Sequence, residues 1–284
     1  MSMGKVRRPA VAGYFYEADP DALRRRVERC FLDPLGPGSL PKVSREGPRR
    51  IKGLVVPHAG LMYSGPVAAH AYLSLAEDGV PETAIIIGPN HTGWGAGISI
   101  MVEGSWSCPL GEVEIDSELA SKIHREANLV AIDEEAHINE HSIEVQLPFL
   151  TYIYGEEVKL VPICMMLQAY EACVDLGRAI ASAAAGRNVV VIAATDFTHY
   201  EPQRSAEVKD RKAIDAILRM DAKGLLDVVA EEDISMCGPG PVASMLIAVA
   251  SWGASKAELL KYATSGDVTR DYSSVVGYAS LKVI

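Results

Sequence analysis

Three short runs of apolar residues determine the predicted architecture of this chain. They cover residues 54–56, 84–87 and 189–194, are rich in valine and isoleucine, and are apolar at successive rather than alternate positions. This pattern is typical of strands that are buried on both faces of a parallel sheet. Each run is followed within a few residues by a histidine, namely His58, His91 and His199. Because ligands bind outside the carboxyl ends of parallel strands, we expect a functional site at this edge.

Helical patterns alternate with these strands. Asp19 and Pro20 predict the start of a helix that runs to about residue 32, and Asp116 predicts the cap of a helix that runs to about residue 127. Further helices are expected near residues 66–76, 169–185, 204–220, 221–231 and up to 251. Further strands are expected near residues 98–102, 111–115, 158–164, 259–264 and 275–283, with a hairpin around residues 108–110 between the first two. The alternation predicts an α/β fold with a largely parallel or mixed sheet flanked by helices.

The 284 residues are expected to form a single domain over residues 1–284, with a flexible N-terminal segment over residues 1–7. The stretch most like a linker, residues 33–50, is rich in proline, glycine and basic residues, and lies too near the N-terminus to separate two domains. We interpret it as a surface excursion.

Charge and cysteine content narrow the class of protein. A formal net charge of −10 argues against nucleic-acid binding, which needs a basic face to neutralise phosphates. No apolar run approaches the length of a membrane span, so no membrane association is expected. The five cysteines are scattered, and no secretory signal precedes them, so a reducing cytoplasm is the expected location.

His58 and His91 are the first candidate site residues. A single histidine at a strand end is usually a hydrogen-bonded loop residue. Two histidines that follow consecutive strands of parallel type are expected to lie close together, which is the arrangement that a metal ion requires. We therefore favour metal ligation for this pair.

Cys237 differs from the other four cysteines, which lie in segments where a buried, inert thiol is the usual role. It precedes a Gly-Pro turn and a predicted helix, where amide donors and the helix dipole favour a thiolate. The sequence leaves open whether it is a nucleophile or a soft metal ligand.

Asp196 and His199 close the third strand. Their spacing allows the carboxylate to orient the imidazole, or both groups to act as acid and base in the same crevice. A role for Asp196 in capping a turn is nearly as good an interpretation.

Residues 137–141 match the pattern His-x-x-Glu-His of one class of zinc proteases, but that mechanism needs both histidines on one helix face. The segment lies at the start of a predicted helix, so we treat the match as coincidental. His141 and Glu144 are kept as candidate crevice residues.

Taken together, the motifs resemble the Memo family, also called the AmmeMemoRadiSam system protein B family in prokaryotes. The resemblance runs from about residue 8 to 283. Six blocks carry it in order: Arg-Pro-Ala-Val-Ala-Gly-Tyr-Phe-Tyr (8–16), Pro-His-Ala-Gly (57–60), Gly-Pro-Asn-His (88–91), Glu-His-Ser-Ile-Glu-Val-Gln-Leu-Pro (140–148), Asp-Phe-Thr-His-Tyr (196–200), and a tail with Tyr262, Ser265 and Tyr278.

The resemblance implies a fold similar to the class III extradiol dioxygenases, whose iron site contains two histidines and a carboxylate. His58, His91 and Cys237 fall on the metal-ligand positions, and His141, Asp196 and His199 fall on surrounding cleft positions. Cys237 stands where the dioxygenase relatives carry glutamate, which argues against extradiol ring cleavage. A thiolate favours iron(II), copper or zinc over magnesium or calcium, and we favour iron(II).

Two functions follow as hypotheses. In the first, the chain is a redox metalloprotein in which the ion and the residues around it act on a small-molecule substrate. In the second, the same cleft binds a protein, peptide or small molecule without turnover, as animal members of the family are described to bind phosphotyrosine-bearing receptor segments. A third interpretation gives the histidines and cysteine a purely structural role, with loss of stability but not of metal on substitution.

Overall fold

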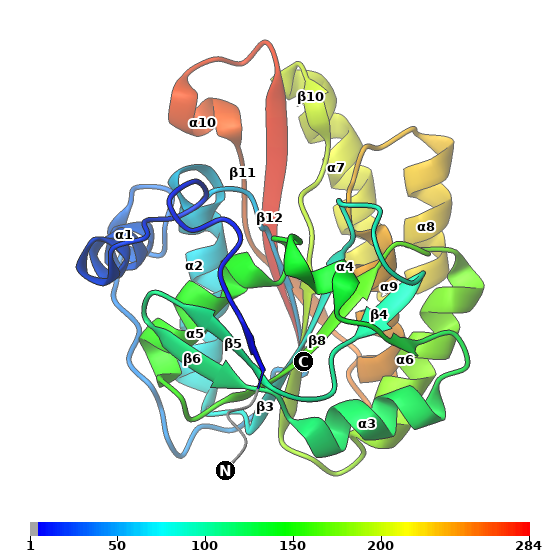
Figure 1. Cartoon of the computed structure of the whole chain (residues 1–284). Helices are drawn as coiled ribbons and strands as arrows, with labels where there is room; N and C mark the ends of the chain where they lie inside the picture. The colour runs from blue at the N-terminus through cyan, green and yellow to red at the C-terminus, as the bar shows by residue number, and fades with distance from the viewer. Residues whose placement is uncertain (1–4) are drawn as a thin grey trace.

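The computed structural model describes residues 5–284, which form a mixed α/β fold with helices on both faces of a central sheet (Figure 1). The sequence expectation of an α/β architecture is therefore confirmed. The helices are α1 (Pro20–Leu32), α2 (Leu61–Asp78), α3 (Ser117–Glu126), α4 (Glu135–Ile138), α5 (Leu147–Tyr154), α6 (Tyr170–Ala183), α7 (Gln203–Leu218), α8 (Ala222–Glu231), α9 (Pro239–Ser251) and α10 (Ser265–Thr269), with a 3₁₀ turn η1 at Glu144–Gln146.

The central sheet is mixed. Its strands run in the order β10-β12-β2-β9-β3-β8-β4-β7, and β11 pairs with β12. The strands are β2 (Gly53–Val56), β3 (Thr83–Pro89), β4 (Ile98–Ile100), β7 (Ala131–Ile132), β8 (Lys159–Met165), β9 (Val189–Ala194), β10 (His199–Glu201), β11 (Ala257–Thr264) and β12 (Val275–Val283). The strands β2, β9, β3 and β8 are parallel. Strand β12 runs antiparallel to its neighbours, and β4 runs antiparallel to β8 but parallel to β7.

The centre of the sheet is apolar on both faces. Every residue of β2, β3 and β9 is buried. The helices α1, α2 and α5 pack together on one side of the sheet, and α3, α6, α9, α8 and α7 follow one another on the other side (Figure 1). Two helical layers therefore exclude water from both faces of the parallel strands, as their unbroken apolar sequences predict.

The strand order has a direct consequence for the site. Although β2 and β3 are consecutive among the long strands of the chain, β9 lies between them in the sheet. The loops that follow β2, β9 and β3 therefore leave the same edge side by side. The segment that begins at Thr195 emerges between the loops that carry His58 and His91.

One expectation about the strands is wrong. Residues 98–102 do not pair with residues 111–115, because β4 pairs with β8 instead. The hairpin turns around residues 108–110 as expected, but it joins β5 (Ser105–Cys108) to β6 (Gly111–Glu114). These two strands form a small second sheet with β1 (Val6–Arg7).

The N-terminal expectation also needs correction. Residues 1–4 lie outside the described part of the chain, but Val6 and Arg7 are not a flexible tail. They pair with β5, and the side chain of Arg7 is buried between Glu144 and the ring of Trp106. Burial of this charge with a carboxylate partner holds the start of the chain in place.

The helix boundaries follow local chemistry. The side chain of Asp19 accepts a hydrogen bond from the amide of Ala22, and that of Asp116 from the amide of Leu119, so both expected caps are confirmed. Helix α2 starts at Leu61, five residues before the expected position at Pro66, and its first amide donates to the carbonyl of Phe15. In the stretch from residue 5 to 284, no helix combines the length and the apolar character needed to cross a membrane.

Candidate metal centre

Three side chains that are far apart in sequence meet beyond the carboxyl ends of β2, β9 and β3. His58 follows β2, His91 follows β3, and Cys237 precedes α9. One ligand atom of each residue lies within 4.8 Å of the others. The sulfur of Cys237 is 3.3 Å from Nε2 of His58, and the ring centroids of His58 and His91 are 5.2 Å apart. The structure therefore brings together the three residues that the sequence selects as candidate ligands.

His58 is buried without being fully hydrogen-bonded. The residue is only 1% exposed, and Nδ1 of its ring has no hydrogen-bond partner among residues 5–284. Burial, together with the neighbouring His141, His91 and His199, lowers the pKa of this imidazole. The ring is therefore neutral, the form in which a histidine can donate an electron pair to a metal ion.

The structure corrects the expectation that the surroundings of Cys237 favour a thiolate. Burial and the nearby carboxylate of Asp196 raise the pKa of the thiol, so the protein alone does not favour a thiolate. The start of α9 does not compensate, because the amide of Gly238 donates to the hydroxyl of Thr195 and the amide of Gly240 donates to the side chain of Gln168. The donors that the sequence pattern offers to the sulfur are thus used elsewhere.

His91 is held by a residue that sequence reasoning missed. Nδ1 of His91 lies 2.9 Å from Oε1 of Glu140, and the backbone amide of His91 donates to Oε2 at 2.6 Å. Glu140 is fully buried. Its burial opposes ionisation, but the hydrogen bonds and charge of His91 and the charge of His141 outweigh it and lower the pKa to about 2. The signal was present in the sequence, because Glu140 directly precedes His141 in the His-x-x-Glu-His match.

His141 lies beside the other two histidines. Its ring centroid is 4.5 Å from that of His91 and 5.4 Å from that of His58, and Phe15 packs against it at 4.7 Å. Burial lowers the pKa of His141 to about 4 despite the opposing charge of Glu140. A second neutral imidazole, besides that of His58, therefore borders the candidate site.

The first histidine of the protease-like match lies elsewhere. Helix α4 ends at Ile138, and the buried ring of His137 packs edge-on against Trp106 with its centroid 5.7 Å away. His137 and His141 do not share a helix face, which supports the interpretation of this match as coincidental.

Asp196 and His199 do not pair as one sequence hypothesis proposed. Asp196 accepts a hydrogen bond from the backbone amide of His58 at 2.9 Å, whereas Nδ1 of His199 is 2.8 Å from the carbonyl oxygen of Ser235. Burial raises the pKa of Asp196 to about 6. The carboxylate therefore orients the backbone of the loop that carries His58, because β9 delivers it between β2 and β3.

Glu144 also differs from its expected position in the crevice. Its buried carboxylate contacts the guanidinium of Arg7 and accepts hydrogen bonds from the amides of Ala10 and Val11 and from the hydroxyl of Tyr16. It fixes the N-terminal segment rather than facing a ligand. Two nearby side chains fix the strand ends: Ser142 donates to the carbonyl of Pro89, and Gln146 donates to the carbonyl of Pro57.

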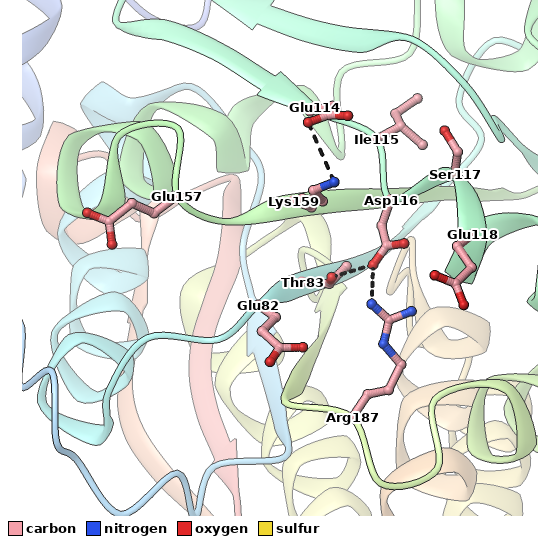
Figure 2. Close-up of a pocket in the computed structure, with 10 residues that line it drawn as sticks. All are labelled: Glu82, Thr83, Glu114, Ile115, Asp116, Ser117, Glu118, Glu157, Lys159 and Arg187. Atoms are coloured by element: carbon pink, nitrogen blue, oxygen red, sulfur yellow. Dashed lines mark hydrogen bonds and ion pairs between the residues drawn. The ribbon is translucent and has the colours of Figure 1, made fainter.

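A different opening lies at the other end of the sheet. Figure 2 shows this pocket of about 420 Å³, which includes Thr83 and Lys159, the first residues of β3 and β8. Asp116 at its centre accepts hydrogen bonds from Thr83 at 2.7 Å and from Arg187 at 2.8 Å (Figure 2). Because β3 spans about 20 Å between its two ends, this pocket is separate from the histidine cluster.

Known proteins share this sequence and this fold. A sequence model of the family described as Memo-like protein matches residues 7–282. A MEMO1 family protein of Methanothermobacter thermautotrophicus is 56% identical over 278 residues, which cover 97% of this chain and 99% of that relative. A MEMO1 family protein of Methanopyrus kandleri is 54% identical over 277 residues, which cover 97% of this chain and 98% of that relative.

A structural comparison supports the fold. The crystal structure of an uncharacterized protein from Escherichia coli K12 aligns with a TM-score of 0.54 over 82% of this chain and 99% of that one, at 15% sequence identity. That likeness concerns the architecture alone. The resemblance noted from six sequence blocks is confirmed by the family match and by the relatives at about half identity, and the chain belongs to the Memo family.

Proposed function

We propose that this protein is a redox metalloprotein that holds one transition-metal ion, with iron(II) favoured, between His58, His91 and Cys237. The observation that carries the proposal is the state of His58. Its ring is buried, and Nε2 lies 3.3 Å from the sulfur of Cys237, in the group of three ligand atoms that also includes one of His91. An ion in place of the thiol proton would use the electron pair of this nitrogen and the sulfur at the same time.

The spacing of the donor atoms supports the same conclusion. In a tetrahedral site with metal–nitrogen bonds of about 2.0 Å and metal–sulfur bonds of about 2.3 Å, the nitrogen and sulfur ligands are about 3.5 Å apart. The observed separation of 3.3 Å between Sγ of Cys237 and Nε2 of His58 is close to that value. An ion at this position also relieves the unfavourable burial of a thiolate, because it neutralises the charge on sulfur.

The donor set favours a transition metal. Two imidazoles and a thiolate suit iron(II), copper or zinc and do not suit magnesium or calcium, which prefer oxygen ligands. Iron(II), when bound, would supply one-electron chemistry and Lewis acidity at a site with a coordination position left for a substrate.

We assign proton transfer to His141, His199 and Asp196. The carbonyl of Ser235 can only accept a hydrogen bond, so Nδ1 of His199 carries the proton and Nε2 is available to a substrate. His141 lies against His91 and His58 as a neutral ring, and is suited to accept a proton. The substrate class that fits this arrangement is one whose reaction combines electron transfer with proton transfer.

Elemental analysis of protein purified without oxygen tests the proposal. We expect about one transition-metal ion per chain in the wild type and its loss in His91→Ala. The matched control is His124→Ala, because His124 is a partly buried histidine on α3 whose Nδ1 lies 2.9 Å from the carbonyl of Val130. This variant should retain the metal.

Each result has a defined meaning. Absence of a transition metal from the wild type after reconstitution with iron(II), copper or zinc would overturn the metal site. Retention of the metal in His91→Ala would overturn the ligand assignment. If the protein binds metal but neither consumes oxygen nor takes up electrons from any reductant tested, the redox assignment would be overturned and a binding function for the cleft favoured.

A further inference from the structure

Two groups of potential metal ligands share His91. The first contains His58, His91 and Cys237, and the second contains His91, Glu140 and His141. In each group the ligand atoms lie within 4.8 Å of one another. A given nitrogen of His91 cannot bind two separate ions. Which group can hold a metal therefore depends on whether Glu140 is free to act as a ligand in the second group.

The carboxylate of Glu140 is already occupied by hydrogen-bond donors. Oε1 accepts from the amides of His141 and Ser142, both at 2.8 Å, and lies 2.9 Å from Nδ1 of His91. Oε2 accepts from the amide of His91 at 2.6 Å. Three of these four donors are backbone amides that cannot act as acceptors, and the side chain is fully buried. Coordination of an ion by Glu140 would require breaking these bonds without water to replace them.

We propose that Glu140 is a positioning residue that selects the tautomer of His91 and directs Nε2 of that ring toward the ion site shared with His58 and Cys237. An ionised carboxylate only accepts hydrogen bonds, so Nδ1 of His91 must carry its proton and Nε2 keeps a free electron pair. A carboxylate behind a ligating imidazole also increases its basicity toward a metal. The part of this inference that concerns metal affinity rests on the proposed function.

The same carboxylate couples two walls of the site. It ties the loop after β3, through the amide and ring of His91, to the backbone at residues 141–142. The hydroxyl of Ser142 adds a second tie to the carbonyl of Pro89, the last residue of β3. Glu140 therefore sets the position of His141 relative to His91 as well as the orientation of His91 itself.

The tautomer can be measured without any metal. Nitrogen NMR of metal-free protein labelled at histidine, recorded at a pH where the His91 ring is neutral and with its signals assigned by their loss in His91→Ala, should report protonation at Nδ1. In Glu140→Gln, which keeps the shape and removes the charge, we expect the Nδ1-protonated form to lose its dominance. The control Glu135→Gln makes the same change at an exposed position of α4 and should leave the His91 signals unchanged.

Anaerobic titration with iron(II) against a competing chelator supplies the second readout. We expect Glu140→Gln to bind iron(II) about 10- to 100-fold more weakly than the wild type, and Glu135→Gln to bind it like the wild type. Thermal melting monitored by circular dichroism shows whether each variant is folded.

The two readouts separate this inference from the proposed function. If the wild type binds no iron(II), the metal site fails while the NMR measurement still decides the role of Glu140. A wild-type His91 protonated at Nε2 would overturn the inference whether or not Glu140→Gln folds. Unchanged iron(II) affinity and an unchanged tautomer in a folded Glu140→Gln would overturn it as well.

Discussion

Two aspartates at opposite ends of the central sheet are equally buried and behave in opposite ways. Asp116 at the amino end and Asp196 at the carboxyl end are each 4% exposed. The pKa of Asp116 is lowered, because the hydrogen bonds from Thr83 and the amide of Leu119 and the charge of Arg187 outweigh its burial. The pKa of Asp196 is raised to about 6, because its burial outweighs the amide hydrogen bonds and the histidine charges around it.

The difference lies in the partners as well as in how completely the protein surrounds each carboxyl, which is more complete for Asp196. Asp116 has a hydroxyl donor and a guanidinium, which stabilise its charged form. Within residues 5–284, Asp196 has no arginine or lysine partner, and its side chain takes its hydrogen bonds from the backbone. Asp116 beside the pocket of Figure 2 is therefore held in its charged form, whereas Asp196 at the carboxyl end can change its charge near pH 6.

The largest effect on stability is expected at Glu144, a carboxylate near the carboxyl end of the sheet that has a structural role. Glu144→Ala leaves the buried guanidinium of Arg7 without its partner and should lower the free energy of unfolding by about 3–5 kcal/mol. Urea denaturation measures this change. The control Glu134→Ala removes the partner of the exposed Lys5 and should cost less than about 1 kcal/mol. Equal losses in the two variants would contradict the assignment of Glu144 to the framework.

At the amino end, Asp116→Asn removes the charge that caps α3 and pairs with Arg187. We expect a loss of about 1–2 kcal/mol in the free energy of unfolding, with metal content unchanged. The control Lys159→Gln breaks an ion pair with Glu114 in the same pocket, but both partners are largely exposed, so its effect should be below about 0.5 kcal/mol. A loss of metal in Asp116→Asn would show that the two ends are not independent.

The pH dependence of Asp116→Asn follows from the lowered pKa. A carboxyl with a lower pKa in the folded than in the unfolded state contributes stability above the unfolded value of 3.8, and that contribution is lost as pH falls through the folded value. The wild type and the variant should therefore differ most near pH 6 and converge below about pH 3.8. Urea denaturation at several pH values gives the difference, and a gap that stays constant down to pH 3 would contradict the lowered pKa.

At low pH the smallest effect on stability is expected from Asp196→Asn. An asparagine oxygen can still accept the amide of His58, so below pH 3.8, where the wild-type carboxyl is protonated in both the folded and the unfolded state, the free energy of unfolding should change by less than about 1 kcal/mol. The sign is opposite to that of Asp116: a raised folded pKa makes ionisation costly, so the wild type should lose stability relative to the variant as pH rises from 3.8 through about 6. A wild type that gains on the variant over this interval would remove the contrast between the two aspartates.

Part of the candidate site could be predicted from the sequence because it depends on local signals. The apolar runs place His58 and His91 just beyond strand ends, and that placement does not depend on which strands are neighbours. Cys237 required the family resemblance as well, since a lone cysteine before a helix has several roles. The expected ionisation of the Cys237 thiol was wrong because the amides at the start of α9 are bonded to Thr195 and Gln168, which lie in the loops that follow β9 and β8.

Glu140 could not be identified in the same way. Its function depends on the loop of residues 139–143 lying against the end of β3, almost fifty residues earlier in the chain. The misplacement of Glu144 has the same origin, because its partners Arg7, Ala10 and Val11 are more than a hundred residues away. No periodicity or cap in the sequence encodes such a contact.

The sequence by itself determined that β2, β3 and β9 are buried strands, where α1 and α3 begin, and that polar side chains follow the buried strands. These features depend on residues within a few positions of one another, where periodicity, capping and β-branching act directly. The tertiary structure alone decided that β9 lies between β2 and β3, that Arg7 is buried beneath Glu144, and that Glu140 holds His91. The reason is that strand order and buried polar pairs depend on how distant segments pack together, and the stability of each pair depends on the donors and the solvent exclusion that this packing creates.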